Sequence, residues 1–355
     1  MRQKQKHILF DCERMKYPHT GLYYFCLQLG LALTRNINVE KEDISFYLPS
    51  SVGKLFGEKY NYISQSSLHK FVFPSVKGFD IWHGTFQGSN YSPKKSSIKK
   101  VLTIHDLNFL LEHKNNTAKK KSNLAKIQKQ INDADRICTI SEFVKKEVLE
   151  NLDVKNKEVQ VVYNGCNLSL NTNPKQPAMI PDKPFVFTIG TIMTKKNFHV
   201  LPALLCNNDL LLVIAGTIME EAYLAKIKEE ANKYGVGNRV IFAGAVSEND
   251  KEWFLKNCLA FAFPSIAEGF GLPVIEAMAF GKPVFLSTAT SLPEVGGDAA
   301  YYFPSFDADE MQQAFQRGME HYIDTSPSEI IKKRAGKFTW EEAAKKYLEI
   351  YRSLY

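Results

Sequence analysis

Residues 260–279 read AFAFPSIAEGFGLPVIEAMA. Positions 260–264 form a short apolar run without polar alternation, which is typical of a strand buried on both faces. A loop with two glycines follows, and a helix is predicted to begin near Leu272 or Pro273, because proline is favoured in the first turn of a helix. A buried strand, a short loop and a helix in succession are the repeating unit of a parallel α/β sheet.

The same alternation extends in both directions along the chain. Further strands are predicted at 7–11, 44–49, 71–74, 80–83, 101–105, 136–141, 159–163, 185–189, 210–215, 240–243, 283–287 and 300–303. Helices are predicted at 20–34, 141–149, 219–234 and 339–354. The sequence thus predicts an α/β protein with two parallel-sheet domains. Ligands of open parallel sheets bind beyond the carboxyl ends of the strands, so site residues are expected there.

A polar stretch rich in proline separates the two series of strands. It contains Pro174, Pro177 and Pro181, and this composition is typical of a linker. The expected division is an N-terminal domain at 1–168, a linker at 169–183, a C-terminal domain at 184–337 and a terminal helix at 338–355.

Composition places the chain among ordinary globular proteins. It has 355 residues, of which 45% are apolar and 23% charged. No apolar run approaches the roughly 18 residues that cross a bilayer, and the first one is too short for a signal peptide. The six cysteines form no C-x-x-C pair, so we expect neither a zinc site nor a disulfide framework. These features predict a cytoplasmic protein.

The net charge of +7 comes from residues 1–170, because the remainder of the chain is slightly acidic. A basic half suits an anionic partner, but it is also the pattern of a solvated lysine-rich face, which charge alone favours. Nucleic-acid binding would rest on this charge alone, and we expect none.

The loop and the predicted helix start within residues 260–279 suit a nucleotide ligand. The glycines beside Phe270 let backbone amides approach a ligand closely, and the amides at the helix start suit a diphosphate. Glu276, in the first turns of the helix, can accept hydrogen bonds from a ribose diol. The alternative is a structural turn with solvent-facing glutamates, and the spacing of Glu268 and Glu276 alone leaves both interpretations open.

A longer sequence pattern favours the nucleotide site over the structural turn. Residues 261–284 fit F-x-x-P-S-x-x-E-G-F-G-L-P-x-x-E-A-M-A-x-G-x-P-V, which resembles the signature of retaining GT-B glycosyltransferases of family 4. The resemblance implies that Glu268 is catalytic and contacts the donor sugar, and that Glu276 binds the ribose. It also implies that backbone amides hold the sugar and phosphates, at Gly269, Phe270, Gly271 and Leu272.

The loop after the strand at 185–189 reads GTIMTKKN from Gly190 onward. Two lysines before a new helix can neutralise a diphosphate leaving group, although a solvated loop would look the same. The segment resembles the family's G-T-x-x-P-R-K-N, with Thr191 where many relatives have arginine and Lys195 also in place of arginine. By this resemblance Lys196 is catalytic, and Lys195 and Gly190 bind the donor.

His105 and Asp106 lie at the carboxyl end of the strand at 101–105. A histidine there is usually a satisfied structural residue, but the family pattern implies that His105 points into a cleft and is catalytic. Asp106 is expected on the acceptor side, and so is His83, which ends the strand at 80–83.

The loop before the first long helix resembles the family's R-T-G-I-G-R-Y. Gly21 is retained, and it is expected to bind the donor near the phosphates. Tyr23 and Tyr24 replace the second glycine and the arginine, and this divergence fits a variable acceptor. The whole resemblance implies the GT-B fold, in which two Rossmann-like domains face each other across a cleft and the helix at 338–355 crosses back to the N-terminal domain.

The resemblance implies transfer with retention of the anomeric configuration. None of the motifs described above contains a D-x-D cluster that would hold a divalent cation against the diphosphate, so we expect a metal-independent reaction without a cofactor, with the nucleotide-diphosphate sugar as co-substrate. The G-T-x-x-x-K-K-N variant resembles mannosyl- and rhamnosyltransferases of surface-polysaccharide pathways and favours GDP-mannose. The expected acceptor is a saccharide or lipid-linked saccharide in bacterial polysaccharide or glycolipid synthesis.

Two alternatives stay open. One is an epimerase-like enzyme of the same fold that acts on nucleotide sugars. The other is an inactive partner protein that binds a nucleotide sugar, which the departures at Thr191 and Tyr23 would fit. We do not expect a dinucleotide-dependent dehydrogenase, because no G-x-G-x-x-G follows a strand.

Lysines cluster in two N-terminal segments, 93–100 and 113–130. Leu124, Ile127 and Ile131 fall at helical spacing in or just after the second segment, so part of it can form a basic amphipathic helix. Such a helix can lie on an anionic membrane at the inner face of the cell, where a lipid-linked acceptor would dock. The alternative is that the apolar residues pack into the core and the lysines only face solvent.

Overall fold

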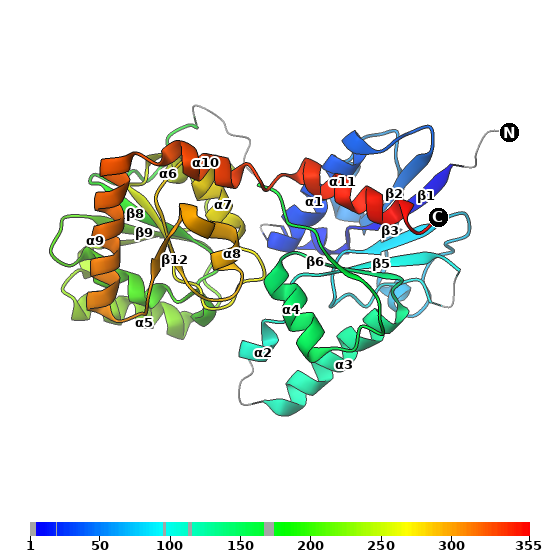
Figure 1. Cartoon of the computed structure of the whole chain (residues 1–355), viewed down its shortest axis with the longest axis horizontal. Coiled ribbons are helices and arrows are strands. Elements are labelled where there is room, and N and C mark those ends of the chain that lie inside the picture. The colour runs from blue at the N-terminus through cyan, green and yellow to red at the C-terminus, as the bar shows by residue number, and fades with distance from the viewer. Residues whose placement is uncertain (1–4, 19, 95–96, 113–115, 167–173) are drawn as a thin grey trace. The chain divides into compact units, whose positions relative to one another are not determined.

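The structure is a computed structural model, which describes residues 5–18, 20–94, 97–112, 116–166 and 174–355 (Figure 1). The chain divides into two compact units. Unit 1 comprises Met1–Gly165 and Phe338–Tyr355, and unit 2 comprises Cys166–Lys337. The part of the predicted linker that precedes residue 174 lies outside the described residues.

In the described part of unit 1, the sheet has seven strands in the order β3-β2-β1-β4-β5-β6-β7, and every neighbouring pair is parallel. The strands are β1 Lys6–Asp11, β2 Glu42–Pro49, β3 Asn61–Gln65, β4 Ile81–Gly84, β5 Lys99–Ile104, β6 Arg136–Thr139 and β7 Val159–Val161. Residues on both faces of β1 are fully buried, among them Ile8, Leu9 and Phe10. This explains why β1 reads as an unbroken apolar run rather than an alternating one.

The sheet of unit 2 is also parallel, and its described strands follow the order β10-β9-β8-β11-β12-β13. Its strands are β8 Phe185–Ile189, β9 Leu211–Ala215, β10 Val240–Gly244, β11 Ala260–Phe263, β12 Val284–Ser287 and β13 Tyr301–Phe303. Strands β9, β11 and β12 are buried along their whole length. Their side chains form the core of the unit.

Helices cover the two sheets. In unit 1 they are α1 Gly21–Asn36, α2 Phe109–Glu112, α3 Thr117–Asp133, α4 Glu142–Asn151 and α11 Trp340–Arg352. In unit 2 they are α5 Glu221–Lys233, α6 Glu248–Asn257, α7 Leu272–Ala279, α8 Leu292–Gly296, α9 Ala308–Thr325 and α10 Ser328–Ala335. Several begin at side-chain caps that satisfy free backbone amides, as where the Ser141 hydroxyl accepts from the Val144 N–H at 3.1 Å.

The predicted α/β architecture with two parallel sheets is confirmed, but one predicted strand is wrong. The segment 71–74 forms no strand: the side chains of Phe71 and Val72 are 78% and 76% exposed, and the partly buried Phe73 packs against the rings of Tyr47 and Trp82. Instead, the polar segment Asn61–Gln65 forms β3. It pairs only with β2 at the edge of the sheet and is only partly buried, so it lacks the apolar run that marks the inner strands.

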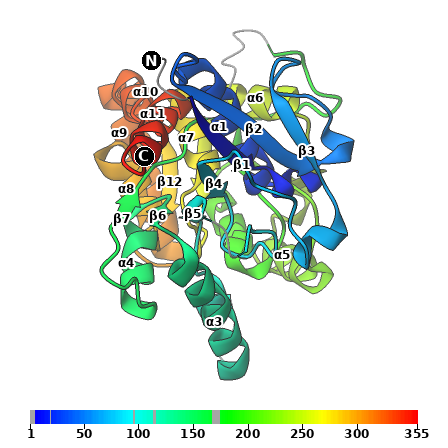
Figure 2. The same ribbon diagram turned by 90° about the vertical axis from the view of Figure 1, so that its right-hand side faces the viewer.

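The terminal helix α11 packs in unit 1 against α1 (Figure 1, Figure 2). A buried chain of hydrogen bonds joins it to the sheet. The Tyr351 hydroxyl bonds to His83 Nδ1 at 2.7 Å, His83 Nε2 bonds to the Thr103 hydroxyl at 2.8 Å, and that hydroxyl bonds to the hydroxyl of Tyr347 at 2.8 Å. Because each of these four side chains has a hydrogen-bond partner, the bonds offset the cost of removing the polar groups from water when the helix docks.

An ion pair holds the end of the same helix. Arg352 donates through Nε and Nη2 to the two carboxylate oxygens of Glu42 at 2.7 and 2.8 Å. Burial alone would raise the pKa of Glu42, but the hydrogen bonds from Arg352 lower it below its ordinary value. The resulting stabilisation is therefore present at neutral pH and decreases as the pH falls below about 4.3, the ordinary pKa of glutamate.

Replacing Arg352 with methionine should lower the free energy of unfolding by about 1.5–3 kcal/mol, because Glu42 loses charge-assisted hydrogen bonds. A urea titration measures the loss. Arg35→Met is the matched control, since the Arg35 and Glu341 side chains are 53% and 49% exposed, and exposed pairs contribute about 0–1 kcal/mol. Equal losses in the two variants would show that the pair of Arg352 and Glu42 stabilises the fold no more than an exposed pair does.

Candidate active site

The strand order of unit 2 reverses between β8 and β11, which lie side by side at the centre of the sheet. Ligands of open parallel sheets bind at such a reversal, beyond the carboxyl ends of the strands. The loop after β8 contains Lys195 and Lys196, and the loop after β11 contains Glu268. The topology therefore brings the two loops that the sequence singles out to the same edge of the sheet.

Hydrogen bonds hold these two loops together. The carbonyl oxygen of Lys195 accepts from the backbone N–H of Ile266 at 2.9 Å and from the hydroxyl of Ser265 at 3.1 Å. Lys195 lies in the 3-10 turn Thr194–Lys196, which ends at Asn197 in a left-handed conformation with φ of 58°. The main chain of Lys195 thus fixes the position of the lysine that follows it.

Lys196 and Glu268 form an ion pair at the mouth of this site. Lys196 Nζ lies 2.6 Å from Glu268 Oε1, and the two side chains are only 13% and 14% exposed. The ammonium also lies 5.0 Å from the ring centroid of Phe263, where the face of an aromatic ring favours a cation. A Cβ at Gly190 would lie 3.3 Å from Lys196 Cε, so the glycine leaves space for the lysine side chain.

The loop that carries Glu268 is fixed by hydroxyl groups from the segment before α8. The backbone N–H of Glu268 donates to the Thr290 hydroxyl at 3.1 Å. The Ser291 hydroxyl lies 3.1 Å from the carbonyl oxygen of Glu268 and 2.9 Å from that of Phe270. Neither hydroxyl is among the predicted site residues, although both hold the loop in place.

Gly271 is the N-cap residue of α7, and a residue with a side chain would be strained at this position. Its φ of 110° lies in the region that side chains rarely adopt, and a Cβ there would lie 2.9 Å from Leu292 Cδ2. The glycine therefore allows the chain to turn sharply from Gly269 and the buried ring of Phe270 into the helix at Leu272. The first amides of α7 form the kind of helix start that suits an anion.

Glu276 lies inside α7 and is buried, with 3% of its side chain exposed. The alternative interpretation of a solvent-facing glutamate is therefore wrong for this residue. Its Oε1 lies 3.0 Å from Lys251 Nζ, and the same ammonium lies 2.8 Å from Glu248 Oε2. Burial by itself lowers the pKa of Lys251, but the charges of Glu276 and Glu248 raise it above its ordinary value.

Lys251 is not among the predicted site residues, although the sequence carries a signal for it. A lysine in an amphipathic helix usually lies on the solvent side. Lys251 instead precedes Phe254 and Leu255 by three and four residues, and both are buried, so it lies on the apolar face of α6. A basic residue at such a position implies a buried acidic partner.

His105 follows β5 in unit 1 and is 8% exposed. Its Nε2 donates to the carbonyl oxygen of Thr85 at 2.7 Å, so the neutral ring carries a lone pair on Nδ1. Burial lowers the pKa of His105 to about 4, and the ring is therefore uncharged at neutral pH. It packs edge to face on Phe25 with a centroid distance of 4.6 Å.

The backbone around His105 and Asp106 is clamped by one side chain. Gln87 accepts from the N–H of His105 at 3.0 Å and donates to the carbonyl oxygen of Asp106 at 2.9 Å. The carboxylate of Asp106 accepts from the N–H of Asn108 at 3.0 Å. These contacts hold the strand end rigidly, as a site that orients a ligand requires.

His83 has a different environment from His105. It is fully buried, both ring nitrogens bond to groups inside unit 1, and burial lowers its pKa to about 3. This geometry gives His83 the structural role of joining α11 to the sheet. Gly21 is the first residue of α1, and a Cβ there would meet no atom within 4 Å. The predicted residues thus form two sets, one in each unit.

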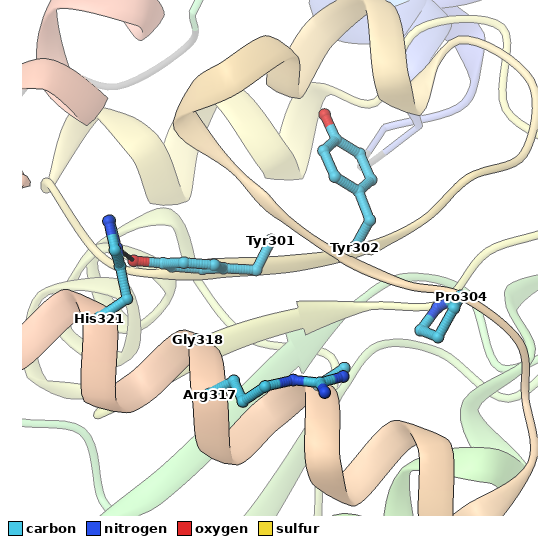
Figure 3. A pocket seen from close by; sticks show the side chains of 7 residues that line it. Tyr301, Tyr302, Pro304, Arg317, Gly318 and His321 are labelled. Carbon is cyan, nitrogen blue, oxygen red and sulfur yellow. Dashed lines mark hydrogen bonds between the residues drawn. The ribbon is translucent and has the colours of Figure 1, made fainter.

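A hollow of about 380 Å³ lies between β13 and α9, away from these residues (Figure 3). The Tyr301 hydroxyl bonds to His321 Nδ1 at 2.8 Å along its edge. The Tyr302 hydroxyl points away, toward the carbonyl oxygen of Gly297 at 2.8 Å. The lining of this hollow includes none of the predicted site residues, so we do not assign the hollow as the active site.

Two protein-family models match consecutive parts of the chain. The model for glycosyl transferases group 1 matches residues 171–336, which include every predicted site residue of unit 2. The model for glycosyltransferase family 4 matches residues 40–170.

Characterised relatives include mannosyltransferases. O-antigen chain mannosyltransferase B of Escherichia coli is 24% identical, over 98% of this chain and all of that protein. The serotype-specific mannosyltransferase WbdA of the same species is 28% identical over 59% of this chain, but the match covers only 28% of WbdA.

Solved structures show the same fold. Sucrose-phosphate synthase from Thermosynechococcus elongatus superposes with a TM-score of 0.74 at 18% identity, over 99% of both chains. HepE from Anabaena, solved with UDP and glucose, gives 0.71 at 16% identity, over 98% of this chain and all of that one. With the two family models, these matches identify the chain as a glycosyltransferase of the group 1 and family 4 type with the GT-B fold.

Proposed function

We propose that this enzyme moves a hexose from a nucleoside-diphosphate sugar to a saccharide or lipid-linked saccharide, with retention of configuration and without a metal ion. The observation that carries the proposal is the pair of Lys196 and Glu268 at the strand reversal of unit 2. A cation and a carboxylate in contact are complementary to a phosphate and a sugar hydroxyl that are joined in one donor.

In this proposal the donor separates the pair. Lys196 turns to the diphosphate, and Glu268 accepts hydrogen bonds from the sugar hydroxyls. The first amides of α7 contact the phosphates, and Glu276 accepts from the ribose diol. Gly190 and the side chain of Lys195 line the same donor pocket, and the donor-binding role expected of Gly21 remains part of the proposal.

The reaction exchanges one bond at the anomeric carbon. The acceptor oxygen forms a bond to this carbon on the face from which the phosphate oxygen leaves, and the acceptor proton passes to the departing phosphate. Lys196 and the helix amides stabilise the charge that develops on the nucleoside diphosphate. The remaining contribution of the protein is to position the two substrates and exclude water.

Unit 1 supplies the acceptor side. Neutral His105 can accept a hydrogen bond from a sugar hydroxyl through the lone pair on Nδ1, while Gln87 holds its backbone. Asp106 offers a carboxylate beside it. We do not extend the acceptor role to His83, because both of its ring nitrogens are engaged inside the unit.

Mannose from GDP-mannose is the donor that we propose. The curated relatives named above are mannosyltransferases, and one of them matches along its entire length. The epimerase-like enzyme and the inactive binding protein remain the competing proposals. An epimerase would convert the nucleotide sugar without releasing a nucleoside diphosphate, and an inactive protein would bind it without turnover.

The function is tested by incubating the purified protein with GDP-mannose or UDP-glucose and measuring the slow release of nucleoside diphosphate to water. We expect GDP-mannose to be the better substrate. Lys196→Met should lower the rate constant about 10²–10³-fold, the usual effect of removing one group that stabilises developing charge. Lys233→Met is the control, because Lys233 is a surface residue of α5 with its side chain 65% exposed. Wild-type rates in Lys196→Met would contradict the role of this lysine.

The same assay tests metal independence. Lys196 and the α7 amides supply the positive charge that a divalent cation would otherwise bring to the diphosphate, so EDTA should leave the rate unchanged. Loss of activity in EDTA, with recovery on addition of magnesium or manganese, would show that the reaction needs a metal.

We also propose that unit 1 docks at the inner face of the cell membrane, where a lipid-linked acceptor would reside. No described helix is both long and apolar enough to span a bilayer. In α3, Ile127 and Ile131 are buried and Leu124 is partly buried, so core packing accounts for most of this apolar stripe, while Lys119, Lys121, Lys126 and Lys129 are exposed. Residues 95–96 and 113–115 of the two basic segments lie outside the described residues.

A second surface supports this proposal. Leu68, Phe71 and Val72 are 72%, 78% and 76% exposed, and the segment they occupy borders a hollow of about 330 Å³. Lys94 reaches this segment, because its Nζ donates to the carbonyl oxygen of Lys70 at 3.1 Å. Exposed apolar side chains among lysines are complementary to an anionic bilayer surface.

Sedimentation with vesicles tests the docking. The protein should bind vesicles that contain phosphatidylglycerol more tightly than phosphatidylcholine vesicles, and high salt should weaken the binding. The double variant Phe71→Ser/Val72→Ser should lose most of it, whereas Ile323→Ser, on an exposed apolar residue of unit 2, should not. Equal and negligible binding to both kinds of vesicle would refute the proposal.

A further inference from the structure

A buried lysine lies directly behind the donor site. Lys251 is 7% exposed and projects from α6 toward α7, and these two helices lie side by side in unit 2 (Figure 1). Its Nζ lies 3.0 Å from Glu276 and 2.8 Å from Glu248. Glu248 is about half exposed, whereas Glu276 is almost fully buried. Water therefore screens the contact of Lys251 with Glu248 but hardly screens the contact with Glu276.

The contact between Lys251 and Glu276 holds two charges in a region that water hardly reaches. Burial disfavours the charged form of a carboxylate, and a neighbouring cation within about 4–6 Å restores it. An ionised carboxylate offers acceptors only, whereas a protonated one carries a hydroxyl that donates. Glu276 can therefore serve as a double acceptor for a diol only while a counter-charge remains beside it.

We propose that Lys251 is a positioning residue of the donor site, which keeps Glu276 ionised and oriented to accept hydrogen bonds from the ribose of the nucleotide sugar. The inference rests on the proposed function, since it concerns the donor that this function requires. Lys251 acts through Glu276 and itself contacts no reacting atom. The loss of its charge should therefore affect the binding of the donor more than the rate of the bound complex.

Other charged groups near α7 do not substitute for Lys251. On α8 and α10, Arg334 donates to the carbonyl oxygens of Val295 and Glu294, and Lys332 pairs with Glu329 at 2.8 Å. The strands β11 and β12 bring no charged residue to α7. The remaining charged residues on these elements are Asp250, Glu252, Lys256, Glu294 and Lys333. Lys251 is thus the cation for which the described structure gives an ion pair with Glu276.

The test is calorimetric titration of the full chain with GDP-mannose and UDP-glucose between pH 5.5 and 8. Both probes are diphosphate diesters, so their phosphates do not titrate in this range. His105, with a pKa of about 4, also stays neutral. Whichever nucleotide sugar binds more tightly, the affinity of the wild-type protein for it should be constant between pH 5.5 and 8, because Glu276 remains ionised throughout.

Lys251→Met should bind at least tenfold more weakly at pH 5.5 and recover part of the affinity as the pH rises and Glu276 loses its proton. Lys251→Arg keeps the charge and should bind within about threefold of the wild type, with a flat pH profile. Lys233→Met, which removes an exposed lysine from α5, is the control. Thermal melting of each variant shows whether it is folded.

Two outcomes would overturn the inference. One is a folded Lys251→Met protein whose affinity equals that of the wild type at every pH, while Glu276→Gln binds weakly. The other needs no variant, and it is a wild-type affinity that itself falls tenfold between pH 8 and pH 5.5. If neither probe binds the wild-type protein, or if Glu276→Gln binds as tightly as the wild type, the proposed donor site is wrong and the role of Lys251 fails with it.

Discussion

The parallel pairing of β8 with β11 is the constraint on which the rest of the site depends. It places the strand reversal at the centre of the unit 2 sheet, so the loops after both strands leave the same edge side by side. The Lys195 carbonyl then joins the loops, and Lys196 meets Glu268 at 2.6 Å. Segments about 70 residues apart in sequence thereby form one polar cluster, which neither loop could form alone.

Two buried carboxylates of the described residues have a cation as partner. Glu276 lies 3.0 Å from Lys251 Nζ, and Glu42 is held by Arg352. The buried rings of His83 and His105 instead carry no charge, because desolvation lowers their pKa values and keeps them neutral. In the proposed chemistry, the charges of Lys196 and Glu276 meet the donor, and the neutral ring of His105 meets a hydroxyl of the acceptor. An ion pair as deeply buried as that of Lys251 and Glu276 contributes little to net stability, so the proposed role in donor binding gives a reason for its presence.

The fold was largely predictable from sequence because buried parallel strands are unbroken apolar runs. The exceptions have a physical cause. β3 escaped detection because an edge strand of mostly polar residues lacks such a run. The segment 71–74 was mistaken for a strand because it has an apolar run, although its residues Phe71 and Val72 are exposed. The contacts of the site were beyond prediction, since Lys196, Glu268 and Lys251 meet their partners through tertiary packing. Only the position of Lys251 on the apolar face of α6 pointed to a buried partner.

The central claim is that the two loops at the strand reversal of unit 2 hold the nucleotide sugar. Hydrogen–deuterium exchange of the full chain, with and without saturating GDP-mannose, tests it most directly. We expect slower exchange at residues 190–197 and 264–279, where the loops and the first turns of α7 contact the donor. Unchanged exchange in both segments, with protection confined to another surface such as the hollow beside Tyr301 and His321, would contradict it.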